Sequence, residues 1–451
     1  MKRTRHKKMF PSLLAFIIPV MMLGTFNLYA GGNKEDTPEA EEVSVVRLVS
    51  ERGSHTEAWK TQMEGFEAAT GIDLEITQHP YANYFDQLML NFTGGQAGFD
   101  VPYISMLWYP TLATAGYIQP LNELVEKNPN LTEDMPGLMK SSIEGNLYFI
   151  PYMNEVGGVV YRTDLFNDPE EQKNFKAKYG YELAPPKTLE QYVDLAEFFH
   201  RPPDLYGVTL MGKKSIFLAT HFMNRLWARG GDLLDADMKP IFDNVIGVQA
   251  LQEAVDMFRY AGSAALSYDF QEALTEFKLG KSAMAELWTT AMFHVNDPAS
   301  SQVVNKASFV GFPKPADAVN EKRPRLYISW GFALSSDAVN KEAALQWIEY
   351  VIGEKQLAEA SPLGTVPARL SALEDQDLIN ALPWLKPFQE ALGDCIPTPM
   401  VPLIPEGNTI VNQFIAPAVS ECLTGNMTAE EALRDAAKKT YDLLKENGYY
   451  D

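Results

Sequence analysis

Aromatic side chains at predicted strand ends and in loops are the residues of this sequence best suited to binding chemistry. A flat ring can stack on the C–H face of a sugar, while carboxylate and amide groups bind the surrounding hydroxyls. The pattern therefore favours non-covalent recognition of a small hydroxylated molecule. Packing in a core is the alternative for each ring. The candidates are Trp108, Tyr109, Tyr152, Trp227, Trp288 and Trp330.

Two polar residues lie close to these candidates or to a predicted strand end. Asn154 comes two residues after Tyr152, and its amide can donate and accept hydrogen bonds together. His55 follows the first predicted strand. A ligand contact and a solvated loop position are both open for this histidine.

The residue patterns of common catalytic centres are missing from the sequence. Its six histidines are scattered, without the His-Glu-x-x-His spacing of zinc hydrolases. Gly280-Lys281-Ser282 is similar to the end of a phosphate-binding loop, but Thr275 stands where that loop needs glycine. We expect no catalytic residue, no metal and no cofactor. Carboxylates are abundant, so an exported glycoside hydrolase is the alternative among enzymes.

Composition and charge indicate a globular protein with more than one domain. The chain has 451 residues, of which 46% are hydrophobic and 22% charged, and this length is too great for a single core. The formal net charge is -21; such a surface repels phosphate backbones, so no nucleic acid partner is expected. The two cysteines, Cys395 and Cys422, can pair in an oxidising compartment but make no disulfide framework.

The first 30 residues have the pattern of a signal peptide. Five Lys and Arg residues lie between Lys2 and Lys8, an apolar run follows at Leu13–Gly24, and a cleavage site is predicted after Ala30. The run is shorter than the ~20 residues that span a bilayer, which disfavours a membrane anchor. No cysteine follows it for lipidation, so we expect export to the periplasm or another extracytoplasmic space. Residues 31–42 are predicted to be a flexible tether.

Beyond the tether, strands and helices alternate. Val43–Ser50 and Ile72–Ile76 are predicted strands, and an apolar repeat of helical spacing begins at Trp59 between them. This order indicates a parallel α/β sheet. Ligands bind at the carboxyl ends of such strands, which places residues 53–55 and 105–109 on one rim.

The stretch Gly145–Phe166 joins two folded regions. It contains two extended runs, Leu147–Tyr152 and Val156–Tyr161, joined through residues 153–155. On its own the stretch is equally consistent with a hairpin. Later in the chain, Thr188 and Thr428 are predicted to begin helices with capping boxes.

The order of these segments resembles the extracellular solute-binding proteins of ABC importers, the group typified by binders of sugars and oligosaccharides. The resemblance extends over nearly all of the chain after the tether, and the order of the segments is more specific than any one of them. The segments are GYIQPLNEL at 116–124, Gly145–Phe166, Pro186–Phe199, GGDLLDADMKPIF at 230–242, GKSAMAELW at 280–288, Trp330–Gly353, GTVPAR at 364–369 and the helix after Thr428.

The resemblance implies an α/β fold of two lobes with a ligand cleft between them. The implied N-terminal lobe consists of residues 43–150 and 308–337, and the C-terminal lobe of residues 156–305 and 340–451. Hinge crossings are expected at 151–155 and 306–313. The two extended runs then belong to different lobes, which replaces the hairpin interpretation.

The resemblance also ranks the site candidates. It favours Trp288 and Trp330, because similar proteins place an aromatic residue after an Ala-Met run and at the later strand, where Gly331 follows. Asp100 and Arg369 match positions where relatives place an acid that contacts ligand and a residue that forms a salt bridge or touches ligand. A structural cap and an ion pair within a lobe are the respective alternatives.

The function implied is capture of a sugar, oligosaccharide or polyol by lobe closure, with delivery to ABC permease transmembrane subunits. We expect a monomer. Few Lys or Arg residues lie at the predicted rim, which disfavours a phosphorylated ligand. A sugar-sensing receptor or adhesion domain with the same clamp is the alternative outside transport.

Overall fold

The computed structural model describes residues 44–136, 138 and 142–450. The predicted signal peptide (1–30) and tether (31–42) lie outside the described residues. Within those ranges, no helix is both long enough and apolar enough to cross a bilayer.

The N-terminal elements form the predicted parallel unit. Strand β1 (Val45–Glu51) pairs in parallel with β2 (Asp73–His79) and with β3 (Val101–Ser105). Helices α1 (Ser54–Lys60), α2 (Met63–Thr70) and α3 (Tyr81–Thr93) connect these strands. The βαβ order read from the sequence is thus confirmed, with the first predicted helix split in two.

One sheet of nine strands extends through the molecule in the order β2-β1-β3-β11-β7-β9-β8, with β10 paired to β7 and β13 to β11. Its further strands are β7 (Ile150–Arg162), β8 (Tyr206–Thr209), β9 (Ser282–Trp288), β10 (Ala307–Gly311), β11 (Arg323–Phe332) and β13 (Cys395–Pro399). Short strands outside it are β4 (Ile118–Gln119), β5 (Ser142–Ile143), β6 (Asn146–Leu147) and β12 (Leu334–Ser335).

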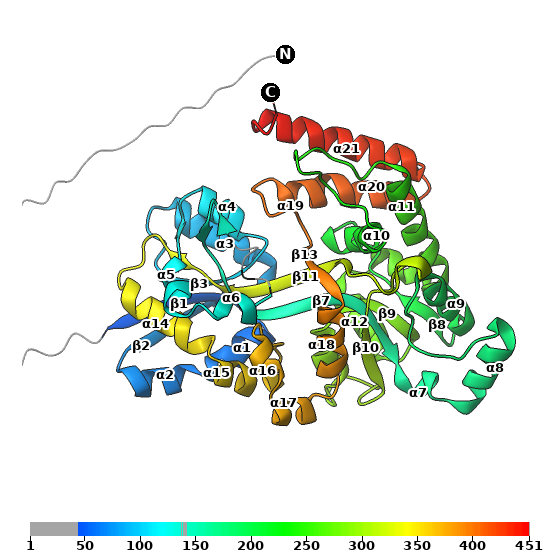
Figure 1. Cartoon of the computed structure of the whole chain (residues 1–451), viewed down its shortest axis with the longest axis horizontal. Helices are drawn as coiled ribbons and strands as arrows, with labels where there is room; N and C mark the ends of the chain where they lie inside the picture. The colour runs from blue at the N-terminus through cyan, green and yellow to red at the C-terminus, as the bar shows by residue number, and fades with distance from the viewer. Residues whose placement is uncertain (1–43, 137, 139–141, 451) are drawn as a thin grey trace, which may run out of the picture. The chain divides into compact units, whose positions relative to one another are not determined.

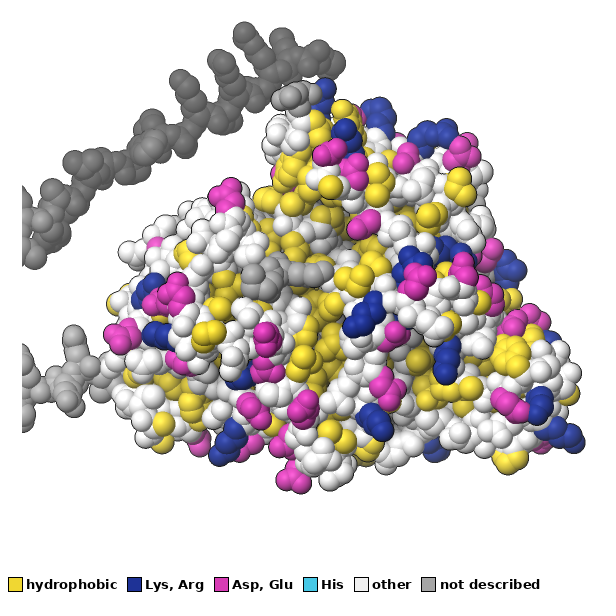
Figure 2. Space-filling view, in the orientation of Figure 1, with side chains coloured by type: hydrophobic (Ala, Val, Ile, Leu, Met, Phe, Trp, Pro, Cys, Tyr) yellow, Lys and Arg dark blue, Asp and Glu magenta, His cyan; other side chains and the backbone are white. Residues whose placement is uncertain are grey.

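Helices surround both ends of the sheet, and Figure 1 shows the long strands β7 and β11 running between two groups of them. Figure 2 shows hydrophobic side chains gathered along the middle of one face, with charged side chains mainly on its flanks. The helices not yet given are α4 (Tyr109–Thr114), α5 (Asn122–Lys127), α6 (Leu131–Asp134), α7 (Thr163–Phe166), α8 (Pro169–Tyr179), α9 (Leu189–Phe199), α10 (Ile216–Ala228), α11 (Val245–Met257), α12 (Phe270–Lys278), α13 (Ala291–Val295), α14 (Lys341–Val351), α15 (Glu354–Ala360), α16 (Leu370–Leu373), α17 (Gln376–Ala381), α18 (Leu385–Gly393), α19 (Gly407–Thr409), α20 (Ala416–Leu423) and α21 (Ala429–Glu446).

Strand β7 replaces the two predicted runs with one continuous strand of 13 residues. Residues 150–156 pair with β11, whereas residues 157–162 pair with β9 and β10. A hairpin within this stretch is therefore wrong. The ends of a single strand belong to different parts of the sheet.

Two segments pack differently from the predicted lobe partition. Strand β10, within the predicted crossing 306–313, pairs with the second half of β7, and the strand that reaches β3 is β11. Helix α14 contacts β1 and β12, and α15 contacts α1. This part of 340–451 thus packs with N-terminal elements, because Trp347 lies against Trp59 and Phe66 at ring distances of 6.0 and 5.3 Å. The lobe boundaries stay a prediction.

Local signals in the sequence are matched closely. Thr188 and Thr428 cap their helices, and both capping boxes are complete. Cys395 and Cys422 are buried free thiols. The two cysteines therefore form no disulfide with each other.

Gly331 lies where β11 changes register against β7. A Cβ added there would come 1.9 Å from the carbonyl oxygen of Ile150, a backbone atom that cannot move aside as a side chain can. We expect Gly331→Ala to lower the free energy of unfolding by roughly 1–3 kcal/mol, as overpacking does. Urea unfolding measures this loss.

Gly393 is the matched control for this substitution, because a Cβ there meets nothing within 4 Å. Gly393→Ala should leave the free energy of unfolding nearly unchanged or raise it slightly. Equal effects of the two substitutions would show that the close approach at Gly331 has no energetic weight.

Candidate functional site

Trp330 is the centre of a ring group on the N-terminal part of the sheet. Its ring centroid lies 5.2 Å from those of His55 and Trp108, 5.9 Å from Tyr103 and 6.0 Å from Tyr81. These residues come from β11, α1, β3, the turn before α4 and the start of α3. We call them the Trp330 group.

Trp288 is the centre of a second ring group. Its ring is stacked on Phe270 of α12, at 5.0 Å and 5° between planes, and lies 5.3 Å from Phe217 of α10. Trp288 and Trp330 are 7% and 6% exposed, so each keeps only an edge open to solvent. We call these three residues the Trp288 group.

The sheet register places both tryptophans beside the same short piece of β7. Trp330 pairs with Met153, and Trp288 pairs with Gly157. Side chains of directly paired residues share a face, and every second residue of a strand points the same way. Glu155, between Met153 and Gly157, therefore points to the face on which both tryptophans lie.

Glu155 is a buried acid that pairs with no Lys or Arg in the described part of the chain. It is 6% exposed, and its Oε2 accepts a hydrogen bond of 2.5 Å from the Thr290 hydroxyl. Burial raises the pKa of Glu155 to about 7, although the Thr290 hydrogen bonds act in the opposite direction. Near neutral pH this carboxyl can thus both donate and accept.

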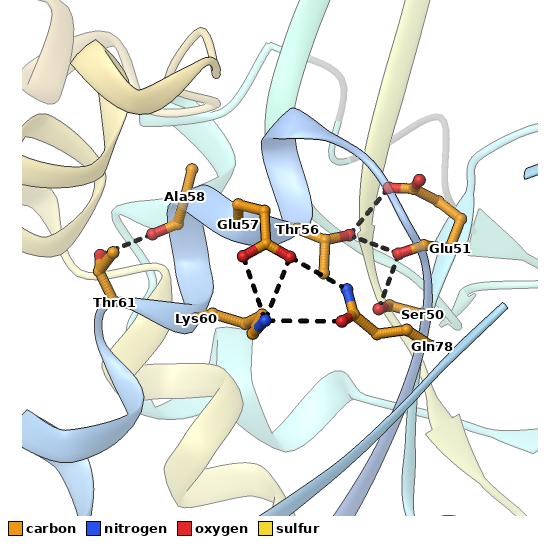
Figure 3. A network of polar contacts seen from close by, with 8 residues as sticks. All are labelled: Ser50, Glu51, Thr56, Glu57, Ala58, Lys60, Thr61 and Gln78. Carbon is orange, nitrogen blue, oxygen red and sulfur yellow. Dashed lines mark hydrogen bonds and ion pairs between the residues drawn. The ribbon is translucent and has the colours of Figure 1, made fainter. Parts of the chain in front are cut away.

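Glu51, at the carboxyl end of β1, is a second acid of the same kind. It is 2% exposed, and Figure 3 shows the Thr56 hydroxyl donating to its carboxylate, at 2.8 Å. Its Oε1 lies 3.0 Å from Nδ1 of His55. Burial raises the pKa of Glu51 to about 7 and lowers that of His55 to about 3, so this histidine is neutral.

Two buried phenols belong to the same neighbourhood. The hydroxyls of Tyr103 and Tyr152 have no hydrogen-bond partner in the described part of the chain. Burial, followed by the charges of Tyr152, Glu51 and Glu155, raises the pKa of Tyr103. The Trp330 group, both carboxyls and two free phenol hydroxyls thus form one neighbourhood with aromatic and polar surfaces.

Three of the polar residues predicted to bind ligand form hydrogen bonds or ion pairs with other residues of the protein. Asp100 accepts from Arg47 Nε and Nη2 at 3.0 and 2.9 Å, and these contacts lower its pKa against the opposing effect of burial. Arg369 pairs with Asp134 at 2.5 Å. Asn154 donates to the carbonyl of Ala368 at 3.1 Å and accepts from the Tyr327 hydroxyl. Ligand contact by these residues stays a prediction.

The remaining aromatic candidates lie in the core. Trp227 is 1% exposed within α10, and Tyr152 is fully buried against Tyr103 and Phe332. Tyr109 is stacked on Phe149, with ring centroids 6.3 Å apart. Each ring is covered by other parts of the protein. Ligand contact by these residues stays a prediction.

Sequence reasoning missed the acids and several rings of this neighbourhood. Glu155 interrupts an apolar strand and Glu51 ends one, and an acid in such a run is a usable signal because burial without a partner is unfavourable. Tyr81, Phe217 and Phe270 gave no signal, because each begins or continues an ordinary amphipathic helix. Across the described ranges, no three His, Cys, Asp or Glu residues are placed to hold a metal ion.

Comparisons with known proteins agree on one family. Residues 52–358 match the family described as bacterial extracellular solute-binding protein. A mannitol-binding protein of Pseudomonas aeruginosa is 27% identical over 378 residues, or 79% of this chain and 82% of that protein. A probable amino-acid ABC transporter periplasmic-binding protein of Sinorhizobium fredii is 22% identical over 415 residues, or 90% of each chain.

A solved structure shares the fold. The solute-binding protein of Agrobacterium radiobacter in complex with ribitol aligns with a TM-score of 0.74 and 23% identity, over 89% of this chain and 98% of that one. This likeness confirms the predicted α/β architecture of two lobes.

Proposed function

Because the chain belongs to the bacterial extracellular solute-binding proteins, we propose that it captures a sugar or polyol outside the cytoplasm for an ABC importer. The observation that supports this most is the placement of Glu155 between Trp288 and Trp330 on one face of the sheet. Rings for C–H faces and carboxyls for hydroxyls are the groups that such a ligand requires.

Two relatives favour the polyol class, since one is a mannitol-binding protein and one is a complex with ribitol. A third is assigned to amino acids. The carboxylate of a free amino acid needs a cation to bind it. The charged residues of this neighbourhood are instead two glutamates, whose partners are threonine hydroxyls. The site chemistry therefore supports a hydroxylated ligand.

The mechanism we propose is closure of the lobes around the ligand. The long strands β7 and β11 connect the two parts of the sheet, and bending near them would bring the Trp288 and Trp330 groups together. Ligand favours the closed form only by the difference between its affinities for the two forms. The permease subunits would then recognise the closed monomer, and the ligand would leave chemically unchanged.

A thermal-shift screen over sugars and polyols tests this function, because a bound ligand raises the apparent stability by mass action. X-ray scattering with the ligand found should show a more compact particle. A panel of binders that leaves the particle size unchanged would contradict closure.

Truncation of the two central rings tests the site itself. Trp288→Ala and Trp330→Ala should each weaken binding by about 1–3 kcal/mol if the indole stacks on the ligand. Calorimetric titration measures this loss. Trp→Leu variants at the same positions keep apolar volume without a flat face, and should show a similar loss with better retained stability.

Trp347→Leu is the matched control for these variants. Trp347 is fully buried against Trp59 and Phe66, and its ring contacts no member of either ring group directly. The Trp347→Leu substitution should lower the stability of the protein and leave ligand affinity unchanged. Unchanged affinity in the Trp288 and Trp330 variants would assign those rings to the core.

A further inference from the structure

The two acids of the site lack the partners that buried carboxyls usually have. Glu51 and Glu155 form no ion pair with Lys or Arg among the described residues. Their closest polar partners are the Thr56 hydroxyl, the Thr290 hydroxyl and the imidazole of His55. An unpaired buried carboxyl is unusual, because the desolvation of its charge is unfavourable.

Two lysines near the site form ion pairs with other acids, and two histidines near it are neutral. Lys213 pairs with Asp269 at 3.1 Å, and Lys60 pairs with Glu57 at 3.1 Å. Burial lowers the pKa values of both His55 and His294. Burial, followed by the charges of Glu155, Glu51 and Asp269, raises the pKa of Tyr81, so a third acid acts on this ring. The buried ionisable groups named here are therefore acids and neutral histidines, and none of them carries a positive charge near neutral pH.

This distribution of charge decides what can lie between the ring groups. A phosphate or carboxylate there would face two acids in a region of low dielectric, where like charges repel strongly. A hydroxyl can donate to an ionised carboxyl or accept from a protonated one. It can do the same with the free hydroxyls of Tyr103 and Tyr152.

We propose that the site selects its ligand by charge, and that Glu51 and Glu155 favour neutral polyhydroxylated molecules over sugar phosphates and sugar acids. This inference rests on the proposed function, since it concerns the same site. It assigns to two residues a role in specificity that is separate from stacking by Trp288 and Trp330.

Matched ligands of one carbon skeleton test the selection. Mannitol, mannitol 1-phosphate and mannonate form one set, and glucose, glucose 6-phosphate and gluconate form another. Titration calorimetry at pH 7.5 should show acidic members binding at least tenfold more weakly than the neutral parent. Glu51→Gln and Glu155→Gln keep the side-chain shape. Each should reduce the difference in affinity between neutral and acidic ligands, which we call the affinity gap, at least threefold.

Glu276→Gln is the matched control. Glu276 is also a buried acid, 8% exposed, and it accepts from the hydroxyls of Thr209 and Tyr268 at 2.6 and 3.1 Å, outside both ring groups. This variant should leave the gap between neutral and acidic ligands unchanged. Circular dichroism and thermal unfolding confirm that each variant is folded before it is titrated.

The possible results separate the two claims. An acidic member that binds at least as tightly as its neutral parent overturns the charge selection and leaves solute binding intact. An affinity gap between neutral and acidic ligands that is unchanged in both Gln variants overturns the role of the two glutamates. If neither these sets nor the wider sugar and polyol panel binds, the proposed function fails, and the inference fails with it.

Discussion

Replacing Arg225 with methionine should lower the free energy of unfolding by about 3–5 kcal/mol, as expected when one partner of a buried ion pair is removed. Arg225 and Glu286 are each 2% exposed at their side chains, and Nη2 lies 2.6 Å from Oε1. His221 adds a contact of 2.5 Å between its Nδ1 and the other carboxylate oxygen. The variant would leave Glu286 buried with an imidazole as its remaining partner.

This cluster also holds one wall of the proposed site. Phe217, His221 and Arg225 lie four residues apart on α10, and thus on one face of the helix. Phe217 contacts Trp288, while the other two bind Glu286, which points to the same side of β9 as Trp288. Loss of Arg225 should therefore loosen the Trp288 group as well as destabilise the chain.

Urea unfolding at pH 7 measures the effect, with Arg229→Met as the matched control. Arg229 pairs with Glu253, but the two side chains are 17% and 32% exposed, so its loss should amount to under about 1 kcal/mol. The double variant Arg225→Met with Glu286→Leu should recover much of the stability, because no unpaired charge remains buried. If Arg225→Met and Arg229→Met lower the free energy of unfolding by similar amounts, the buried ion pair does not stabilise the protein more than the exposed one, which contradicts the prediction.

The two acids of the site should make stability depend on pH in the direction opposite to an ordinary ion pair. Glu51 and Glu155 have folded pKa values of about 7, against 4.5 for the free side chain. Between these values the folded state binds more protons than the unfolded state, so stability falls as pH rises. Above about pH 7 both acids are ionised, and the full penalty of burial remains.

Comparison of Glu155→Gln with the unsubstituted protein isolates this effect. The stability difference between them should shift in favour of the variant by about 2–3 kcal/mol between pH 5 and pH 8. His55 acts with the opposite sign, because its pKa is lowered to about 3, but it contributes equally to both proteins. Urea titrations over this range measure the difference, and a difference that does not vary with pH would refute the raised pKa.

Capping and strand signals show how far local patterns reach. Thr188 and Thr428 begin helices as predicted, and the strands predicted at Val43–Ser50 and Ile72–Ile76 are found at Val45–Glu51 and Asp73–His79. Each signal depends on residues only three to seven positions apart, so no distant contact can alter it much. By contrast, Leu147–Tyr152 and Val156–Tyr161 read as two runs, because the polar pair Asn154 and Glu155 interrupts the apolar pattern.

Tertiary contacts decided the roles of the polar residues. Asn154 is bonded to Ala368 and Tyr327, more than 170 positions away, and Asp100 to Arg47. Such partners cannot be read from neighbours in the chain, which is why Asp100 and Asn154 were ranked as ligand contacts. The pairing of β7 with both β11 and β9 likewise brings Glu155 between two tryptophans that are 42 positions apart.

The α/β class could be inferred from the alternation of strands and helices along the chain, and the family from the order of many segments together. Export and the binding roles of Trp288 and Trp330 stay predictions. The continuity of β7, the packing of α14 with the N-terminal strands and the burial of Glu51 and Glu155 were decided only in the folded chain. Desolvation is the physical reason: whether a carboxyl is solvated or enclosed depends on which distant segments cover it, and that follows from sheet register.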